Sequence, residues 1–530
     1  MDAPYSRTLA ELLFEQAGRY GTQPAVICGD RQISYADQAF RAGRIAAGLR
    51  GREIGRGDRV GLLMNNRLEW LEVFFGAAIV GATVVAFSTW SKRGELEWLL
   101  GDADVRVLFT LDRFGEQNFA EDLRVLAPTL AAPFHGVILG DPGASGAQPY
   151  AQFGLDPAIA QPLAPGVGSS AADDAIVIYT SGSSSRPKAV PLAHYGIIEN
   201  GFNIGERQGY RPGDRVLLAP PLFWSYGCAN AMSATLTHGA TLVLQSRFEP
   251  GEAIELIERH ACTALYTLPA ITAAIVSHAS FRPERTRSLR TGVTIGTPQD
   301  LLAAARVLGA AEICNVYGQT ESYGNCCVTP HHWSLERRSQ CQGLPLPGVT
   351  LRIVHPETGA KLPQGEDGLI EVRGYLTRGY GDANAQLTAE AFADDGFFRT
   401  GDMGHLTEHG ELVFVGRTTE MIKKGGINIS PAEVEDVLMR HPSVGQVGVV
   451  GVPDPRQGEL LAAFIVLKPG QAASREELAA HCRSLASAYK VPDRIEFRAE
   501  LPITVTGKLM RRELKQLALA ATDREKAASA

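Results

Sequence analysis

The sequence predicts an α/β fold in which parallel sheets are covered by helices, followed by a smaller α+β domain. Short apolar runs at residues 58–64, 241–245 and 264–268 predict buried strands, and helical patterns such as residues 9–20 and 254–260 separate such runs. This alternation is typical of parallel strands joined by crossover helices.

A change of pattern near residue 416 predicts the smaller domain. Its predicted strands and helices are residues 445–452 and 461–467, and residues 430–441 and 475–489. A mixed unit of about a hundred residues is an ordinary domain size. We therefore expect domains at residues 1–416 and 417–530.

The longest apolar stretch, residues 73–87, is too short to span a bilayer. Its composition becomes β-branched near Thr83, which predicts a buried helix that leads into a buried strand. The first residues lack the basic and apolar pattern of a signal peptide. We expect a cytoplasmic protein without a transmembrane segment.

Composition excludes several classes of function. The chain has 530 residues, of which 45% are hydrophobic, and its net charge of 51 − 58 = −7 argues against a nucleic-acid partner. None of the eight cysteines forms a CxxC pair, which favours reduced thiols over a metal site.

The segment TSGSSSRPK, residues 180–188, is the first candidate for a binding site. It follows the predicted strand 176–179 and combines five hydroxyl side chains with Lys188. Ligands gather at the carboxyl ends of such strands, and hydroxyl and N–H groups can bind phosphate there. A nucleotide P-loop is excluded because Pro187 stands where glycine must precede the lysine. A solvated serine-rich turn is the alternative.

Four later segments also carry polar groups at turns. NVYGQTES places Thr320 and Glu321 after a glycine, and FFRTGDMG places Asp402 at a turn. A hydroxyl can donate to a phosphate, a carboxylate can hold Mg²⁺, and an acidic residue can accept the hydroxyls of a ribose. The third segment, VGRTTEMIKKGGINISPAEVE, contains Arg417, and the fourth, LPITVTGKLMRREL, contains Lys508. Taken singly, each could be a helix cap, a turn residue or an exposed lysine.

Taken together and in this order, TSGSSSRPK, VYGQTE, RTGD, GR and TGK resemble the motifs of the adenylate-forming superfamily, in its acyl-CoA synthetase branch. The resemblance covers residues 8–514. It implies a large N-terminal domain of two α/β subdomains plus a β-barrel-like subdomain, with a small, mobile C-terminal domain.

The resemblance also implies a ligase. The family activates a carboxylic acid with ATP as acyl-AMP, releases pyrophosphate, and transfers the acyl group to the thiol of coenzyme A, with Mg²⁺ as cofactor. The enzyme mainly aligns the carboxylate with phosphorus and neutralises developing charge. Two alternatives stay open: transfer to a separate carrier protein, and an impaired member that performs one half-reaction. A homodimer is also left open.

The resemblance assigns roles to individual residues. Lys508, Thr320 and Glu321 would be catalytic, and Glu321 would hold the Mg²⁺. The ATP or AMP site would comprise Thr180, Ser181, Gly182, Ser183, Ser184, Ser185, Lys188, Gly296, Thr297, Pro298, Asn315, Tyr317, Gly318, Asp402 and Arg417. The acyl pocket would comprise Trp224, Tyr226, Gly227, Ile295, Gly296, Tyr323 and Gly324. None of these pocket residues is charged, which favours a monocarboxylic acid with an apolar body.

The C-terminal domain would alternate between two poses. Thr419 would lie at the hinge, and Gly425 and Gly426 would line the passage for coenzyme A, where glycine permits close approach. The chain departs from the family pattern in three places: Ser185 and Ala189 replace glycines at the phosphate loop, Thr419 replaces Asp or Lys, and Trp224 replaces a common histidine. Trp224 could instead be core packing.

Overall fold

The computed structural model describes residues 7–131, 133–154, 163–165, 169–180, 187–381, 384–418, 420–424, 427–454, 457–486, 488–503 and 509–529. The chain divides into two compact units, Met1–Thr350 with Val372–Phe398, and Leu351–Glu371 with Arg399–Ala530. The predicted boundary between residues 416 and 417 separates the part of the chain that is expected to move, which is a different criterion from compactness. It stays a prediction.

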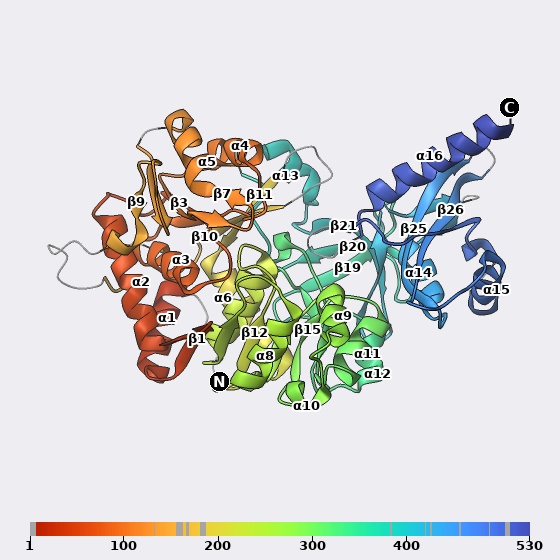
Figure 1. Ribbon diagram of the computed structural model, residues 1–530, viewed down its shortest axis with the longest axis horizontal. Coiled ribbons are helices and arrows are strands. Elements are labelled where there is room, and N and C mark those ends of the chain that lie inside the picture. The colour runs from red at the N-terminus through yellow and green to blue at the C-terminus, as the bar shows by residue number, and fades with distance from the viewer. Residues whose placement is uncertain are drawn as a thin grey trace. The chain divides into compact units, whose positions relative to one another are not determined.

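The first unit contains a sheet of seven described strands (Figure 1). In sheet order these are β11 (Lys188–Ala193), β10 (Asp174–Thr180), β4 (Thr83–Ala86), β3 (Arg59–Leu63), β5 (Val107–Leu111), β8 (His135–Leu139) and β9 (Gln148–Pro149). All neighbours pair in parallel except β10 and β11, which form a hairpin.

A second sheet of the same unit has nine described strands. In sheet order these are β18 (Leu344–Pro345), β17 (Cys327–Val328), β16 (Cys314–Tyr317), β15 (Thr291–Thr294), β14 (Ala264–Tyr266), β12 (Arg215–Leu218), β13 (Thr241–Leu244), β1 (Pro24–Cys28) and β2 (Arg31–Ser34). The strands from β16 to β1 pair in parallel, and β2, β17 and β18 pair antiparallel at the edges. The prediction of parallel sheets is confirmed.

Helices follow many of these strands, as a parallel sheet requires. In chain order they are α1 (Leu9–Tyr20), α2 (Tyr35–Arg50), α3 (Leu68–Val80), α4 (Arg93–Ala103), α5 (Phe119–Leu126), α6 (His194–Gln208), α7 (Ser233–Thr237), α8 (Pro250–His260), α9 (Pro269–Ser277), α10 (Pro283–Thr286), α11 (Pro298–Arg306), α12 (Leu335–Gln340) and α13 (Ala385–Ala391). A π-helix, η3, spans Tyr226–Met232 and leads directly into α7.

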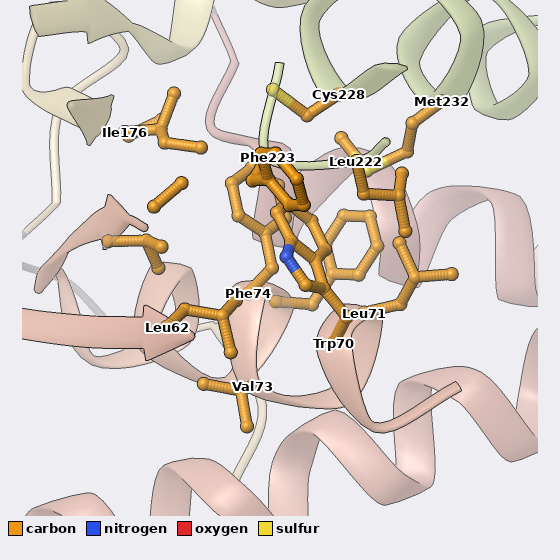
Figure 2. Packing of buried hydrophobic residues seen from close by; sticks show 14 of the residues in the cluster. Leu62, Trp70, Leu71, Val73, Phe74, Ile176, Leu222, Phe223, Cys228 and Met232 are labelled. Carbon is orange, nitrogen blue, oxygen red and sulfur yellow. The ribbon is translucent and has the colours of Figure 1, made fainter. Parts of the chain in front are cut away.

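Helix α3 lies in the core of the first unit. All of its residues are buried, and Gly81 ends it in the left-handed conformation before β4 begins at Thr83. The predicted change from buried helix to buried strand is confirmed. Figure 2 shows Trp70 and Phe74 of α3 packed near Leu222 and Phe223, which follow β12. One hydrophobic cluster includes residues of both sheets, so α3 helps to hold their strand ends in place.

The described residues of the second unit form two sheets. One is a four-stranded sheet of β19 (Thr350–Val354), β20 (Gly368–Arg373), β21 (Phe398–Leu406) and β22 (Leu412–Arg417). The other contains β24 (Ile427–Ile429), β23 (Ile422–Lys424), β26 (Gly458–Leu467), β25 (Val444–Asp454) and β27 (Arg494–Phe497). Helices α14 (Pro431–Met439), α15 (Arg475–Leu485) and α16 (Arg511–Ser529) complete this α+β unit. Within the described residues, no helix combines the length and apolar character needed to cross a membrane.

Candidate active site

The hairpin of β10 and β11 carries the predicted phosphate loop. Thr180 and Lys188 are register partners at the end of this hairpin where the predicted loop connects the two strands. The ammonium of Lys188 lies 4.7 Å from the centre of the Tyr380 ring. Because a cation is attracted to the face of an aromatic ring, Tyr380 helps to fix where Lys188 points.

Glu321 is joined to the same tyrosine. The Tyr380 hydroxyl donates a 3.1 Å hydrogen bond to Oε1 of Glu321, and the Glu321 carbonyl accepts a 2.7 Å bond from the N–H of Thr377. Burial raises the pKa of Tyr380, and the Glu321 carboxylate raises it further, so the phenol stays a proton donor. Lys188, Tyr380 and Glu321 thus form one connected group in the first unit.

Glu321 is also the carboxylate that fits a magnesium ion. Its exposed fraction is 9%, and no cluster of three or more potential protein ligands was found among the described residues. Mg²⁺ that accompanies a nucleotide is commonly held by one or two carboxylates together with phosphate oxygens and water. A single carboxylate beside a predicted phosphate site fits that pattern.

A tight turn presents Thr320 and Glu321. Residues Thr320–Ser322 form a single 3₁₀ turn after β16, and Tyr323 then adopts the left-handed conformation with φ of 58°. A bulky residue rarely takes that conformation, so the surrounding contacts must hold it. Asn230 of η3 supplies one of them, since its Nδ2 donates a 2.7 Å bond to the Tyr323 carbonyl.

Thr320 contacts the segment that follows β12. Its hydroxyl lies 3.1 Å from the hydroxyl of Ser225, which is next to Trp224. The residue predicted to touch phosphate is therefore hydrogen-bonded to the neighbour of a residue predicted to touch the acid. The carboxyl ends of β12 and β16 bring the two together, as is usual for ligand sites in parallel sheets.

The predicted acyl-pocket residues have different environments. Ile295 is 43% exposed and Trp224 is half-buried, whereas Tyr226 and Tyr323 are buried. The Tyr226 hydroxyl lies 3.0 Å from the carbonyls of both Thr267 and Val293, and the Tyr323 hydroxyl accepts the N–H of Ala193. Each phenol hydroxyl therefore makes a hydrogen bond to the backbone at or near the end of a strand. Their assignment to the pocket stays a prediction.

The glycines of this region permit close backbone approach. A Cβ on Gly227 would lie 2.2 Å from the Pro221 carbonyl oxygen, and one on Gly318 would lie 2.3 Å from that of Gly324. Glycine at these two positions therefore lets neighbouring backbone segments of the site lie close together.

The predicted adenine residues lie at the ends of β15 and β16. Thr297 caps α11, its hydroxyl donating to Asp300, and Pro298 begins that helix. Asn315 is buried, and its Nδ2 donates to the Cys341 carbonyl. Gly296 and Tyr317 complete the set, and Tyr317 is also buried. The Asn315 amide therefore has a structural partner, and its assignment to adenine stays a prediction.

The predicted ribose residues lie together in the second unit. Asp402 of β21 and Arg417 of β22 are register partners, and Nε of Arg417 lies 3.5 Å from Oδ1 of Asp402. The carboxylate is buried on its strand. A carboxylate held beside an arginine on paired strands suits acceptance of two ribose hydroxyls.

Several predicted residues lie outside the described part of the chain. They are Ser181, Gly182, Ser183, Ser184 and Ser185 of the phosphate loop, the hinge residue Thr419, the glycines Gly425 and Gly426, and Lys508.

Three side chains of the site were not predicted from the sequence: Trp90, Ser225 and Tyr380. Trp90 lies in the turn beyond the carboxyl end of the predicted strand that begins at Thr83, a position that could have identified it. Ser225 could have been found as the hydroxyl beside Trp224. Tyr380 lies far along the chain from Lys188 and Glu321, and no spacing rule connects it to either.

Comparison with known proteins identifies the family. A family model described as AMP-binding enzyme matches residues 13–381, and one described as AMP-binding enzyme C-terminal domain matches residues 433–508. The chain belongs to the AMP-binding enzyme family. This is the predicted adenylate-forming superfamily, and its acyl-CoA synthetase branch is supported by the relatives.

Two curated relatives and one solved structure illustrate the match. An acyl-CoA ligase of Aspergillus fumigatus is 32% identical, with 99% of this chain and 93% of that protein covered. A feruloyl-CoA synthase of an Amycolatopsis species is 32% identical, with 93% and 95% covered. The crystal structure of an anthranilate CoA ligase in complex with anthranoyl-AMP has a TM-score of 0.87 at 28% identity, with 98% and 99% covered. The predicted fold and the predicted class, an ATP-dependent acid–CoA ligase, are confirmed.

Proposed function

We propose that this ligase activates an apolar monocarboxylic acid, with Thr320 and Glu321 acting on the phosphates and Trp224 contacting the acid. The hydrogen bond between Thr320 and Ser225 carries the proposal, because it joins the residue predicted to bind phosphate to the neighbour of the residue predicted to contact the acid. The uncharged residues predicted for the acyl pocket support an acid without a second carboxylate.

The first half-reaction forms one bond and breaks another at the α-phosphorus. A carboxylate oxygen attacks, and the bond to the oxygen that bridges to the β-phosphate breaks, so pyrophosphate leaves. Thr320 would donate to an α-phosphate oxygen, and Lys188 and the predicted Lys508 would offset the negative charge. Mg²⁺, held by Glu321, would neutralise phosphate charge.

The second half-reaction transfers the acyl group. The sulfur of coenzyme A attacks the acyl carbonyl, the bond to the AMP oxygen breaks, and the thiol proton passes to solvent. The residues predicted for this step, the hinge residue Thr419 and the glycines Gly425 and Gly426, belong to the proposed lid, whose rotation would carry Lys508 out of the site. A separate carrier protein stays the alternative acceptor, and a homodimer and a cytoplasmic location stay predictions.

An acid panel tests the proposal. We expect pyrophosphate release and coenzyme A consumption with benzoate, trans-cinnamate or octanoate, and little with malonate, whose second carboxylate would lack a partner. Mass spectrometry of mixtures with coenzyme A and with a carrier protein identifies the acceptor. Release of pyrophosphate without consumption of either acceptor would indicate a one-step enzyme. A preference for malonate would contradict the proposed acid class.

Thr320→Val tests the proposed catalytic hydroxyl. Valine keeps the shape and removes the donor, so we expect the rate of ATP–pyrophosphate exchange to fall by about 100-fold. Thr235→Val is the matched control, because the Thr235 hydroxyl donates to the Ala231 carbonyl of its own helical segment. Equal losses in the two variants would indicate a general effect on folding rather than catalysis.

A further inference from the structure

Trp90 is a partly exposed tryptophan at the edge of the candidate site. It lies on the turn between β4 and α4, and its backbone N–H donates a 3.1 Å hydrogen bond to the Ser88 hydroxyl. Its exposed fraction is 36%, although the ring contacts two other aromatic rings. A tryptophan that served only as core would normally be buried more completely.

The three rings meet nearly at right angles. The Trp90 ring centre lies 5.2 Å from that of Trp224 at 74°, and 5.4 Å from that of Phe223 at 84°. Phe223 and Trp224 are also perpendicular, at 6.2 Å and 87°. Edge-to-face contact of this kind is favourable and gives each ring a defined orientation. Because Phe223 is buried, the two half-open rings are those of Trp90 and Trp224.

This aromatic corner, defined as Trp90 and Trp224, adjoins the reacting groups. Trp224 precedes Ser225, whose hydroxyl is 3.1 Å from that of Thr320. Trp90 follows a strand of the seven-stranded sheet, and Trp224 follows a strand of the nine-stranded sheet. The corner therefore joins the carboxyl ends of two sheets, where ligands of parallel sheets bind.

Two perpendicular rings can distinguish an acid with a planar aromatic ring from an acid with an alkyl chain. An aryl ring can stack on one indole and meet the other edge-on, so it gains both preferred geometries of aromatic pairs. An alkyl chain gains only from the apolar area that it buries. We infer that Trp90 is a specificity-determining residue, which with Trp224 favours acids with a planar aromatic ring over alkanoic acids. This inference rests on the proposed function.

The test compares two acids in three variants. We expect Trp90→Leu to lower kcat/KM for trans-cinnamate relative to octanoate by about 3- to 10-fold, the value of one aromatic pair. Trp90→Phe keeps an aromatic edge and should recover most of the ratio. The KM for ATP should stay unchanged in both. Phe40→Leu, at a side chain that is 54% exposed on α2, is the matched control and should leave the ratio unchanged.

Binding supplies a readout that does not depend on turnover. Calorimetric titration of trans-cinnamate in the presence of α,β-methylene-ATP, whose α–β bridge cannot be cleaved, should show weaker binding to Trp90→Leu than to Trp90→Phe, at equal melting temperatures. A wild-type enzyme that prefers octanoate, or an unchanged ratio in Trp90→Leu, would overturn the role of Trp90 and leave the ligase function intact. No coenzyme A consumption with any acid would contradict the proposed function itself.

Discussion

Two hydroxyl groups from the ends of separate strands meet in the first unit. Ser225 and Thr320 are 95 residues apart in the sequence, yet their oxygens are 3.1 Å apart. Either hydroxyl can be the donor of this bond, and donation by Ser225 would leave the Thr320 proton free to reach a phosphate oxygen. The residue with a predicted chemical role thus depends on one that no motif marks.

Ser225→Ala should weaken catalysis without a large effect on folding. A neutral hydrogen bond contributes about 0.5–1.5 kcal/mol, so we expect ATP–pyrophosphate exchange to slow by about 2- to 12-fold. The KM for the acid should change less than kcat, because Thr320 would act on the phosphate. Ser233→Ala is the control: the Ser233 hydroxyl donates to the backbone of its own helical segment. Wild-type exchange by Ser225→Ala would show that the bond does not orient Thr320.

At the scale of elements, the turn after β16 depends on η3. Asn230 of η3 donates to the Tyr323 carbonyl, and its Oδ1 would lie 2.4 Å from a Cβ placed on Gly324. Gly324 has φ of 90°, a conformation that side chains rarely adopt. The turn can therefore form only with glycine here and with the helical segment already packed beneath it.

Gly324→Ala should be more destabilising than an ordinary glycine substitution at positive φ. Gly396 has φ of 80°, and a Cβ placed on it would have no atom within 4 Å, so Gly396→Ala should cost about 1–2 kcal/mol from the backbone alone. Collision with the buried Asn230 amide should add about 1–3 kcal/mol in Gly324→Ala. Thermal unfolding of both variants measures the difference. Equal melting temperatures would mean that Asn230 moves aside at little cost.

Elements with strong local signals could be predicted from the sequence. Helix α1 spans the predicted residues 9–20, and β3, β13 and β14 lie at the predicted apolar runs. The π-helix could not be predicted, because the extra residue per turn is fixed by contacts such as Asn230 with Tyr323. Thr320 and Glu321 came from a motif of adjacent residues. Tyr380 reaches the site through tertiary packing, which no local pattern encodes.

At the scale of the whole molecule, buried ionisable groups make stability depend on pH. Burial raises the pKa of Glu69, but hydrogen bonds and charge from Arg31 outweigh it, and the net pKa is lowered. Glu69 therefore stabilises the fold above its ordinary pKa near 4.5 and loses this contribution as pH falls through the folded value. His194 responds at higher pH, because burial lowers the pKa of its imidazole from 6.5 to about 4.

His194 joins two helices of the first unit. It begins α6, and its Nδ1 accepts a 3.2 Å hydrogen bond from the Leu9 N–H at the start of α1. Protonation would replace this acceptor with a second donor and place a charge in the core. Nearby Asp173 and Glu11 favour the charged form, but the loss of hydration outweighs them.

We therefore expect stability to fall on acidification before the carboxylates titrate. The folded pKa of His194 lies below the unfolded one, so the unfolded chain binds more protons between pH 6.5 and about 4, and the contribution is lost as pH falls through this range. By pH 5 the loss should be about 2 kcal/mol. Asparagine can accept the Leu9 N–H through Oδ1 but does not titrate, so His194→Asn should lose about that much less stability than wild type between pH 7.5 and 5. Denaturant unfolding at each pH measures this, and the two proteins should respond in parallel between pH 7.5 and 8.5, where the imidazole is neutral in both states. Parallel responses down to pH 5 would instead show that other groups set the acid limit of the fold.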